Sequence, residues 1–391
     1  MITIRLKPGR EGPVRAGHPW IFSGAIGSIH GQGAAGTLAR VTAADGRVLG
    51  IGYHNPNCSI AVRMLTREDK PIDARFLRQR LEIALTLRRA LLQPDTTGYR
   101  LVNGEGDFLP GFVVDVYGQF LICQCLTAGA EALKPLLIDG LVSLLSPQGI
   151  YEKSEGNVRQ EEGLPNTTGL LWGVEPPSLI AIQENSCQFL IDPRGGQKTG
   201  FFLDQRDNRL LARNLAEERL VLNGFAYTGG FGILAAKGGA KHVISVESSD
   251  AALRLARRNW ATNLLPEQQG TFLQADMFAY LREAHPQFDF IILDPPPFVR
   301  RRQDVQAGLK GYKEINLQAF RSLAPGGHIL TFSCSQHVSV QDFQQTVLFA
   351  AADAGREVQL LKHLGPAVDH PHNLAHAEGA YLKGLWLRMG D

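Results

Sequence analysis

The sequence predicts an α/β protein in three parts: a small, mostly β domain over residues 1–70, an α+β domain over 71–178, and a doubly wound domain over 179–391. Short apolar runs between glycine-rich turns in the first part predict strands. Apolar residues at helical spacing begin soon after Pro71. From about residue 180, apolar strands alternate with amphipathic helices, which is typical of a parallel sheet covered on both faces.

The first two parts are predicted from local patterns. Strands are expected in "ITIRLKPGR", "GTLARVTA", "RVLGIGYH" and "IAVRML", and a helix with arginines on its polar face is expected in "DARFLRQRLEIALTLRRALL". Strands follow in "YRLVNGEGDFLPGFVVDVYGQFLICQCL", where Cys123 and Cys125 alternate toward one buried face, and a helix near "EALKPLLIDGLVSLL". Residues 151–178 are dense in proline, glycine and charge, so much of this segment is expected to be loop.

Seven strands are predicted in the third part. They are "RLVLNGF", "HVISVE", "TFLQAD", "FDFIILD", "HILTFS", "EVQLLKH" and "LKGLWLRM". The last two, at 356–363 and 381–389, have no helical segment between them. We therefore expect a terminal hairpin and a mixed seven-stranded sheet.

Composition excludes several classes of protein. The chain has 391 residues, 44% of them hydrophobic, and a net charge of +2, so a nucleic-acid surface has to come from local basic clusters. Its five cysteines are scattered and include no Cys-x-x-Cys pair, which argues against a disulfide framework or a zinc site. With no apolar leader segment and no membrane span in the sequence, a cytoplasmic protein is expected.

Three histidines, His370, His372 and His376 in "DHPHNLAH", raise the question of a metal site. No cysteine is nearby, and a proline and an asparagine interrupt helical spacing. We therefore expect no metal.

Polar residues end four successive strands of the third part. Asn223 precedes the glycine-rich turn "AYTGG", with Tyr227, Thr228 and Gly229, and Glu247 follows 24 positions later. Asp276 and Asp294 end the next two strands. The carboxyl ends of strands are where open α/β sheets bind ligands, and an acid after the second strand suits ribose hydroxyls. Each acid is alternatively a helix cap, but their joint placement favours a ligand site.

The longer motifs carry a resemblance. In their order, "GQKTGFFLDQRDNR", "LNGFAYTGGF", "DPPPF", "GYKEINLQAF", "SCSQHVS", "DHP" and "YLKGLWLR" resemble the bacterial family of large-subunit ribosomal RNA 5-methylcytosine methyltransferases. The segment "LKPGREGPVRAGHPWIFSGAI" is similar to that family's PUA domain, a small RNA-binding fold. The resemblance runs from near residue 4 to near residue 389. It implies a Rossmann-like, class I methyltransferase domain with S-adenosylmethionine as the cofactor and large-subunit ribosomal RNA as the partner; a homodimer stays an open alternative.

The resemblance also implies site residues. The turn residues named above, with Asn223, Glu247, Asp276 and Asp294, would hold the cofactor, and Gln205 and Arg206 in "TGFFLDQR" would contact it. The alternative for this segment is a helix start capped by Asp204. In many RNA 5-methylcytosine enzymes a second cysteine follows the Asp-Pro dipeptide, but Pro296 stands there in this chain.

Cys334 in "TFSCSQHV" is the expected nucleophile, and a strand-end packing residue is the alternative. Cytosine C5 attacks a sulfonium methyl poorly until a thiolate adds to C6 and makes the ring an enamine. Asp294 would hold the N3 and N4 edge of the base. His337 and the neighbouring serines are candidate helpers, and His337 is equally well explained as a solvated loop residue.

A basic segment beside the predicted pocket holds Arg300, Arg301, Arg302, Lys310 and Lys313. It favours contact with RNA phosphates, against the plainer interpretation of a solvated face. Two alternatives to cytosine C5 methylation stay open. One is an exocyclic amino methyltransferase that uses "DPPPF" without a cysteine; the other is a non-catalytic RNA-binding or ribosome-assembly protein, which Asn223 permits because many methyltransferases have an acid there.

Overall fold

The computed structural model describes residues 1–283 and 287–390, and its chain forms two compact units. The first unit comprises Met1–Ile182, Ile191–Leu203 and Val368–Gly379. The second comprises Gln183–Leu190, Asp204–Ala367 and the residues from Ala380 to the end of the described chain. Two short segments, from the middle and from near the end of the sequence, therefore belong to the first unit.

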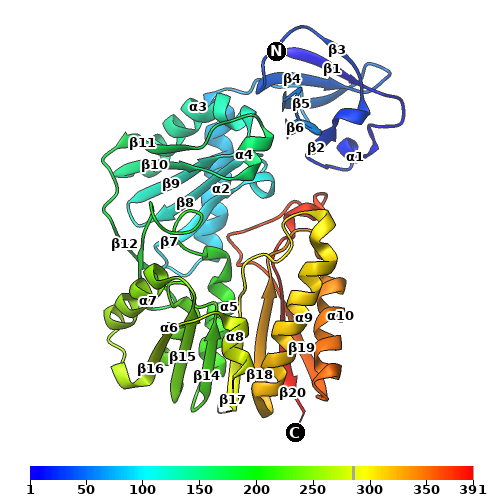
Figure 1. The fold of residues 1–391 in the computed structure, drawn as a ribbon. Helices are drawn as coiled ribbons and strands as arrows, with labels where there is room; N and C mark the ends of the chain where they lie inside the picture. The colour runs from blue at the N-terminus through cyan, green and yellow to red at the C-terminus, as the bar shows by residue number, and fades with distance from the viewer. Residues whose placement is uncertain (284–286, 391) are drawn as a thin grey trace. The chain divides into compact units, whose positions relative to one another are not determined.

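The N-terminal part of the first unit is a β domain, as the sequence predicts (Figure 1). Its strands pair in the order β2-β6-β5-β4-β1-β3, and apolar side chains such as Ile4, Val41 and Val62 are fully buried. The elements are β1 (Ile2–Leu6), α1 (Gly12–Arg15), β2 (Trp20–Phe22), β3 (Ile26–His30), β4 (Thr37–Thr42), β5 (Val48–His54) and β6 (Ile60–Thr66).

An α+β arrangement completes the first unit. Its five-stranded sheet has the order β11-β10-β9-β8-β7, and Cys123 and Cys125 are buried in the core, as expected. The elements are α2 (Ala74–Leu91), β7 (Gly98–Asn103), β8 (Phe112–Tyr117), β9 (Phe120–Cys125), α3 (Ala128–Leu145), β10 (Gly149–Ser154), α4 (Asn157–Glu161) and β11 (Thr167–Gly173). The hairpin of β12 (Ile180–Glu184) and β13 (Cys187–Ile191) follows.

The expectation that much of residues 151–178 is loop holds only between the regular elements found there. Strands β10 and β11 pair antiparallel there, with α4 between them. Strand β11 lies at the sheet edge, and none of its side chains is fully buried. Leu171 packs against the core but is only partly buried, and Leu170 and Trp172 are exposed. With apolar residues on both faces and two glycines, the strand lacks the usual alternation of apolar and polar residues.

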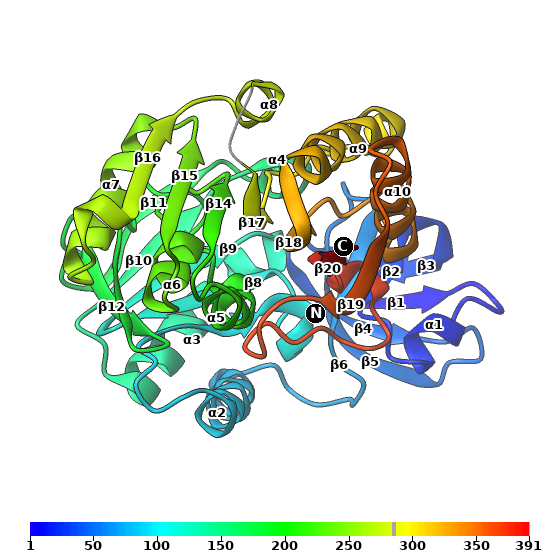
Figure 2. The same ribbon diagram turned by 90° about the horizontal axis from the view of Figure 1, so that it is seen from below.

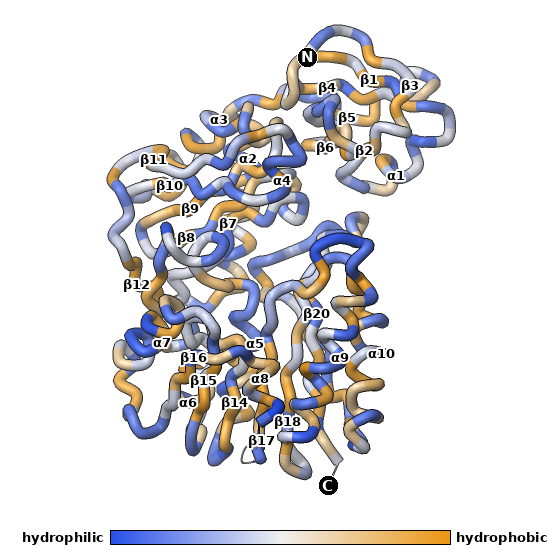
Figure 3. Tube along the Cα trace, in the orientation of Figure 1, coloured by the Kyte–Doolittle hydropathy of each residue, from blue (hydrophilic) through white to orange (hydrophobic). Residues whose placement is uncertain are grey.

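The second unit contains the predicted mixed sheet, in the order β16-β15-β14-β17-β18-β20-β19. All pairs are parallel except those of β20, which runs antiparallel to β18 and β19. The strands are β14 (Leu220–Gly224), β15 (His242–Glu247), β16 (Gly270–Gln274), β17 (Phe288–Leu293), β18 (Leu323–Ser333), β19 (Val358–Leu364) and β20 (Lys383–Met389). Figure 3 shows apolar residues concentrated along these strands.

Helices cover this sheet on both faces (Figure 2). Residues of α8 (Met277–Arg282), α9 (Val305–Ser322) and α10 (Val340–Asp353) share one core cluster with the strands. The other helices of the unit are α5 (Arg206–Leu215), α6 (Gly230–Lys237) and α7 (Asp250–Thr262). Strand order reverses between β14 and β17, and ligands of such sheets bind outside the carboxyl ends of the strands at this point.

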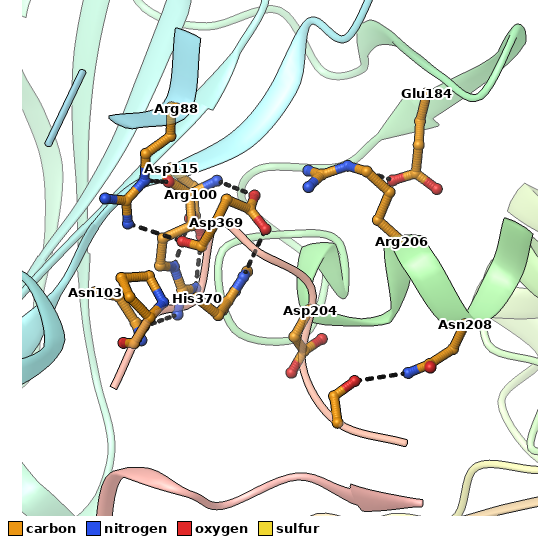
Figure 4. A network of polar contacts seen from close by, with 12 residues as sticks. Arg88, Arg100, Asn103, Asp115, Glu184, Asp204, Arg206, Asn208, Asp369 and His370 are labelled. Carbon is orange, nitrogen blue, oxygen red and sulfur yellow. Dashed lines mark hydrogen bonds and ion pairs between the residues drawn. The ribbon is translucent and has the colours of Figure 1, made fainter. Parts of the chain in front are cut away.

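The histidine-rich segment 368–379 is fixed inside the first unit by buried polar contacts (Figure 4). Arg88 of α2 forms two hydrogen bonds with Asp107, at 2.5 and 2.7 Å, and donates to the carbonyl of Asp369 at 2.8 Å. The Asp369 carboxylate accepts from the backbone N–H of Arg100 and contacts His370 Nδ1 at 3.0 Å. The segment is therefore anchored by charge pairing and backbone contacts.

No cluster of histidine, cysteine or carboxylate side chains suited to a metal ion occurs in residues 1–283 and 287–390. Two of the three histidines have other partners: His370 contacts Asp369, and His376 packs edge-to-face against Trp20 with ring centroids 4.3 Å apart. None of the helices in the described part of the chain has the length and hydropathy of a membrane-spanning segment.

Candidate active site at the carboxyl ends of β14, β15, β17 and β18

The glycine-rich turn joins β14 to α6 and is tied to β15. The backbone N–H of Tyr227 donates to Glu247 Oε2 at 2.9 Å, and the other carboxylate oxygen accepts from the backbone N–H of Ser249 at 2.8 Å. Gly229, the residue before α6, adopts a φ of 86°, which a residue with a side chain rarely does. The structure thus brings the turn and Glu247 together, as the sequence predicts for neighbouring strand ends.

Thr228 in this turn has a buried hydroxyl without a partner. The residue is 2% exposed, and Oγ1 has no hydrogen-bond partner among the described residues. Its carbonyl is satisfied by Asn259 Nδ2 at 3.1 Å. A buried hydroxyl that forms no hydrogen bond costs about 1–3 kcal/mol. A ligand atom in the turn is the natural partner for it.

The other residues expected to hold a cofactor have protein partners. Asn223 is buried and donates to Ser245 Oγ at 3.3 Å, and the exposed Asp276 caps α8 by accepting from Ala279 N at 2.8 Å. Gln205 is buried at the start of α5 and accepts from Asn208 at 2.6 Å. Helix capping therefore accounts for Asp276 in this structure, and its expected contact with the cofactor stays a prediction.

Arg206 is buried and lies 3.7 Å from Glu184 in an ion pair (Figure 4). Glu184 also accepts two hydrogen bonds from Arg209, at 2.6 and 2.7 Å. In the same segment, Tyr381 donates to Asp204 at 2.5 Å. These contacts fix the start of α5, and the expected cofactor contact of Arg206 stays a prediction.

Cys334 lies next to the residues that follow β17. Strands β17 and β18 pair in parallel with Leu293 opposite Thr331, so their carboxyl ends are adjacent. The Cys334 thiol donates to the carbonyl oxygen of Pro295 at 3.8 Å, and both Cys334 and Asp294 are half-buried. The structure therefore brings the predicted nucleophile beside the Asp-Pro dipeptide at the edge where the strand order reverses.

Two further residues hold this arrangement through contacts with Ser335, and neither of the two was singled out in the sequence. Tyr312 of α9 contacts Ser335 Oγ at 2.8 Å, and this oxygen accepts from the backbone N–H of Val299 at 3.1 Å. Lys383 Nζ donates to the carbonyl of Ser335 at 2.6 Å. Tyr312 and Lys383 belong to the motifs "GYKEINLQAF" and "YLKGLWLR", so the signal was present although no role was assigned.

The basic segment is mostly solvent-exposed. Arg300, Arg301, Arg302 and Lys310 are exposed, which leaves their charges accessible. Lys313 instead forms an ion pair with Asp353 of α10 at 2.6 Å. The exposed arginines are thus better placed than Lys313 for the expected contact with phosphates.

Comparisons with known proteins agree with this architecture. A model for PUA-like domains matches residues 4–67, and one for S-adenosylmethionine-dependent methyltransferases matches residues 146–385. A solved structure described as a candidate SAM-dependent methyltransferase from Streptococcus mutans covers 99% of this chain and all of its own, with a TM-score of 0.85 and 22% identity. Another candidate methyltransferase, complexed with SAH, aligns with a TM-score of 0.86 over 99% of this chain and all of its own at 22% identity.

The observed turn fits S-adenosylmethionine. The partnerless Thr228 hydroxyl, the positive φ of Gly229 and the carboxylate of Glu247 lie together at the N-terminus of α6. A cofactor with ribose hydroxyls and a charged amino acid part offers partners for such groups. The predicted cofactor, S-adenosylmethionine, is confirmed by the family match and agrees with this donor set.

Replacing Thr228 with valine is expected to raise the Kd for S-adenosylmethionine about 5–10-fold, because the complex loses about one hydrogen bond. Thermal stability should stay unchanged or rise, because no protein group loses a partner. Titration calorimetry and thermal unfolding measure the two effects. The control is Thr346→Val in α10, whose hydroxyl donates to the Asp342 carbonyl at 2.7 Å; this variant should bind the cofactor normally. An unchanged Kd in Thr228→Val would remove Thr228 from the cofactor site.

Curated relatives extend the match to nearly the whole chain. The protein named ribosomal RNA large subunit methyltransferase I from Vibrio parahaemolyticus is 42% identical over 98% of both chains. The protein of the same name from Tolumonas auensis is 43% identical over 99% of both. With its PUA-like domain followed by an S-adenosylmethionine-dependent methyltransferase domain, the chain belongs to the family of the ribosomal RNA large subunit methyltransferase I proteins.

Proposed function

We propose that this methyltransferase forms 5-methylcytosine in large-subunit ribosomal RNA through a covalent bond between Cys334 and C6 of the base. The observation that carries the proposal is the position of the Cys334 thiol, 3.8 Å from the Pro295 carbonyl oxygen and beside the carboxyl end of β17. The names of the relatives support ribosomal RNA as the substrate class. Such a substrate is consistent with the cytoplasmic location expected from the sequence.

The chemistry assigns a role to each of two side chains. Bound S-adenosylmethionine would supply an electrophilic methyl group and would leave as S-adenosylhomocysteine. The Cys334 thiolate forms a bond to C6, which moves the ring electron pair to C5 and makes C5 nucleophilic. After methylation, a base removes the C5 proton, the electron pair returns to the ring, and the bond between C6 and sulfur breaks. Asp294 holds the N3 and N4 edge and stabilises the charge that develops there.

A base inside a duplex cannot reach such a pocket, so the target cytosine has to be extruded from its stack. The exposed arginines 300–302 follow Asp294 closely in the sequence and suit the phosphates of the flanking nucleotides. The PUA-like domain is a second RNA contact implied by the family.

Product identification tests the proposal. Unmodified large-subunit ribosomal RNA is incubated with the full chain and S-adenosylmethionine, digested to nucleosides and analysed by mass spectrometry. We expect 5-methylcytidine. A methylated exocyclic amino group would instead support chemistry at the "DPPPF" motif without a covalent adduct. If neither naked RNA nor ribosomal particles gain a methyl group, the proposed activity is wrong.

A further inference from the structure

The polar environment of Cys334 contains one buried cation. Lys383 is the first residue of β20, and the antiparallel pairing of β18 with β20 places it opposite Ser333, the residue before Cys334. Lys383 is 4% exposed, and its Nζ donates to the carbonyls of Ser335 and Tyr381, both at 2.6 Å. The ammonium of Lys383, on β20, thus contacts Ser335, the residue directly after Cys334 at the end of the neighbouring strand β18.

Among the described residues, the two hydrogen-bond acceptors of Lys383 are neutral carbonyls, and no carboxylate takes this role. Burying an ammonium without an anion is costly. Burial accordingly lowers the pKa of Lys383 to about 8, whereas the nearby charge of Cys334 acts in the opposite direction and raises it. An ammonium has three protons, and the two carbonyls account for two of them.

We propose that Lys383 is the counter-ion that favours the thiolate form of Cys334 and that it fixes the Cys334 loop through the Ser335 carbonyl. The inference rests on the proposed role of Cys334 as nucleophile and names the group that prepares it. A neighbouring cation stabilises a thiolate and lowers its pKa below the ordinary value of about 8.5. Lys383 is therefore a positioning residue that acts through the sulfur.

Other titratable groups around the loop do not supply this charge. Tyr312 comes from α9, and burial raises the pKa of its phenol, so it stays neutral near pH 7. Asp294 follows β17 and carries the opposite sign, which opposes a thiolate. His337 lies on the same loop and is exposed to solvent. Lys383 is thus the buried cationic side chain of this set.

The thiol can be titrated without RNA or cofactor. The full chain is alkylated with iodoacetamide between pH 5.5 and 10, and the rate is followed on the Cys334 peptide by mass spectrometry. The remaining cysteines interfere little, because Cys123, Cys125 and Cys187 are buried and burial raises the pKa of Cys58 to about 11. We expect half-maximal alkylation of Cys334 below the pH of about 8.5 typical of a free thiol.

Lys383→Met is expected to raise the pH of half-maximal Cys334 alkylation by at least about one unit. At pH 7, alkylation of Cys334 should therefore be roughly tenfold slower than in the wild type. Lys383→Arg keeps the charge and should restore a midpoint close to that of the wild type. The matched control is Lys153→Met, which removes another buried lysine whose Nζ donates to the Gly196 carbonyl in the first unit. Equal midpoints in the wild type and Lys383→Met would overturn the proposal.

A reciprocal measurement covers the case in which Lys383→Met loosens the fold, which fast alkylation of the buried cysteines would reveal. In Cys334→Ala, NMR titration of the Lys383 ammonium should show a lower pKa than in the wild type, because its anionic neighbour is gone. An unchanged Lys383 pKa would contradict the pairing. Neither readout depends on methyl transfer, so failure of this inference is distinguishable from failure of the proposed activity.

Discussion

Replacing Cys334 with alanine is expected to lower kcat for cytosine methylation by a factor on the order of 10⁴ or more, because removal of a covalent nucleophile removes the reaction path. The Kd for S-adenosylmethionine should change less than about twofold, since the turn that carries Thr228 and Gly229 does not contain this side chain. Single-turnover methylation and titration calorimetry measure the two quantities.

Cys58→Ala is the control for that experiment. Cys58 is also half-buried, but its thiol donates to the Glu161 carbonyl in the first unit at 3.2 Å. Its removal should leave methylation unchanged. Full activity of Cys334→Ala would make Cys334 a packing residue and would favour the exocyclic amino chemistry.

Replacing Arg88 with methionine is expected to lower the free energy of unfolding of the first unit by about 3–5 kcal/mol. The arginine is 1% exposed, and it is the ion-pair partner of the buried Asp107. Methionine fills a similar volume but leaves the carboxylate buried without its cation and leaves the Asp369 carbonyl without this donor. Urea unfolding of the full chain, followed by a fluorescence probe in the first unit, measures the change.

Arg78→Met tests whether charge removal on helix α2 is enough to produce the effect. Arg78 pairs with Glu82 one turn along the same helix at 2.9 Å, and both side chains are largely exposed. An exposed pair of this kind contributes about 0.3–0.5 kcal/mol. If both substitutions lowered the free energy of unfolding equally, the buried network around Arg88 would contribute no more to stability than an exposed ion pair.

The mixed sheet was predictable from sequence, and so was the position of Cys334 beside the Asp-Pro dipeptide. Buried strands show continuous apolar runs, and the carboxyl ends of neighbouring parallel strands lie at one edge of a sheet. Strand β11 was missed, because an edge strand without buried side chains lacks that signal. Periodicity identifies elements that bury apolar side chains and says little about the others.

Partners of polar side chains were less predictable. Lys383 reaches the Ser335 carbonyl from 48 positions along the chain, and Lys313 pairs with Asp353 on another helix. The contacts of Asp369 with Arg88 and Arg100 join residues more than 260 positions apart and depend on a C-terminal segment that packs with the first unit. Such contacts are set by strand order and register, which local sequence patterns do not specify.

The most direct test of the account is to trap the bond between Cys334 and the base. Large-subunit ribosomal RNA transcribed with 5-fluorocytidine is incubated with the full chain and S-adenosylmethionine. Fluorine replaces the C5 proton that a base must remove, so elimination of the sulfur stops after methylation. We predict a denaturant-resistant complex with the RNA attached at Cys334, absent from Cys334→Ala. Normal methylation of ordinary RNA without any complex on the fluorinated RNA would contradict the covalent mechanism.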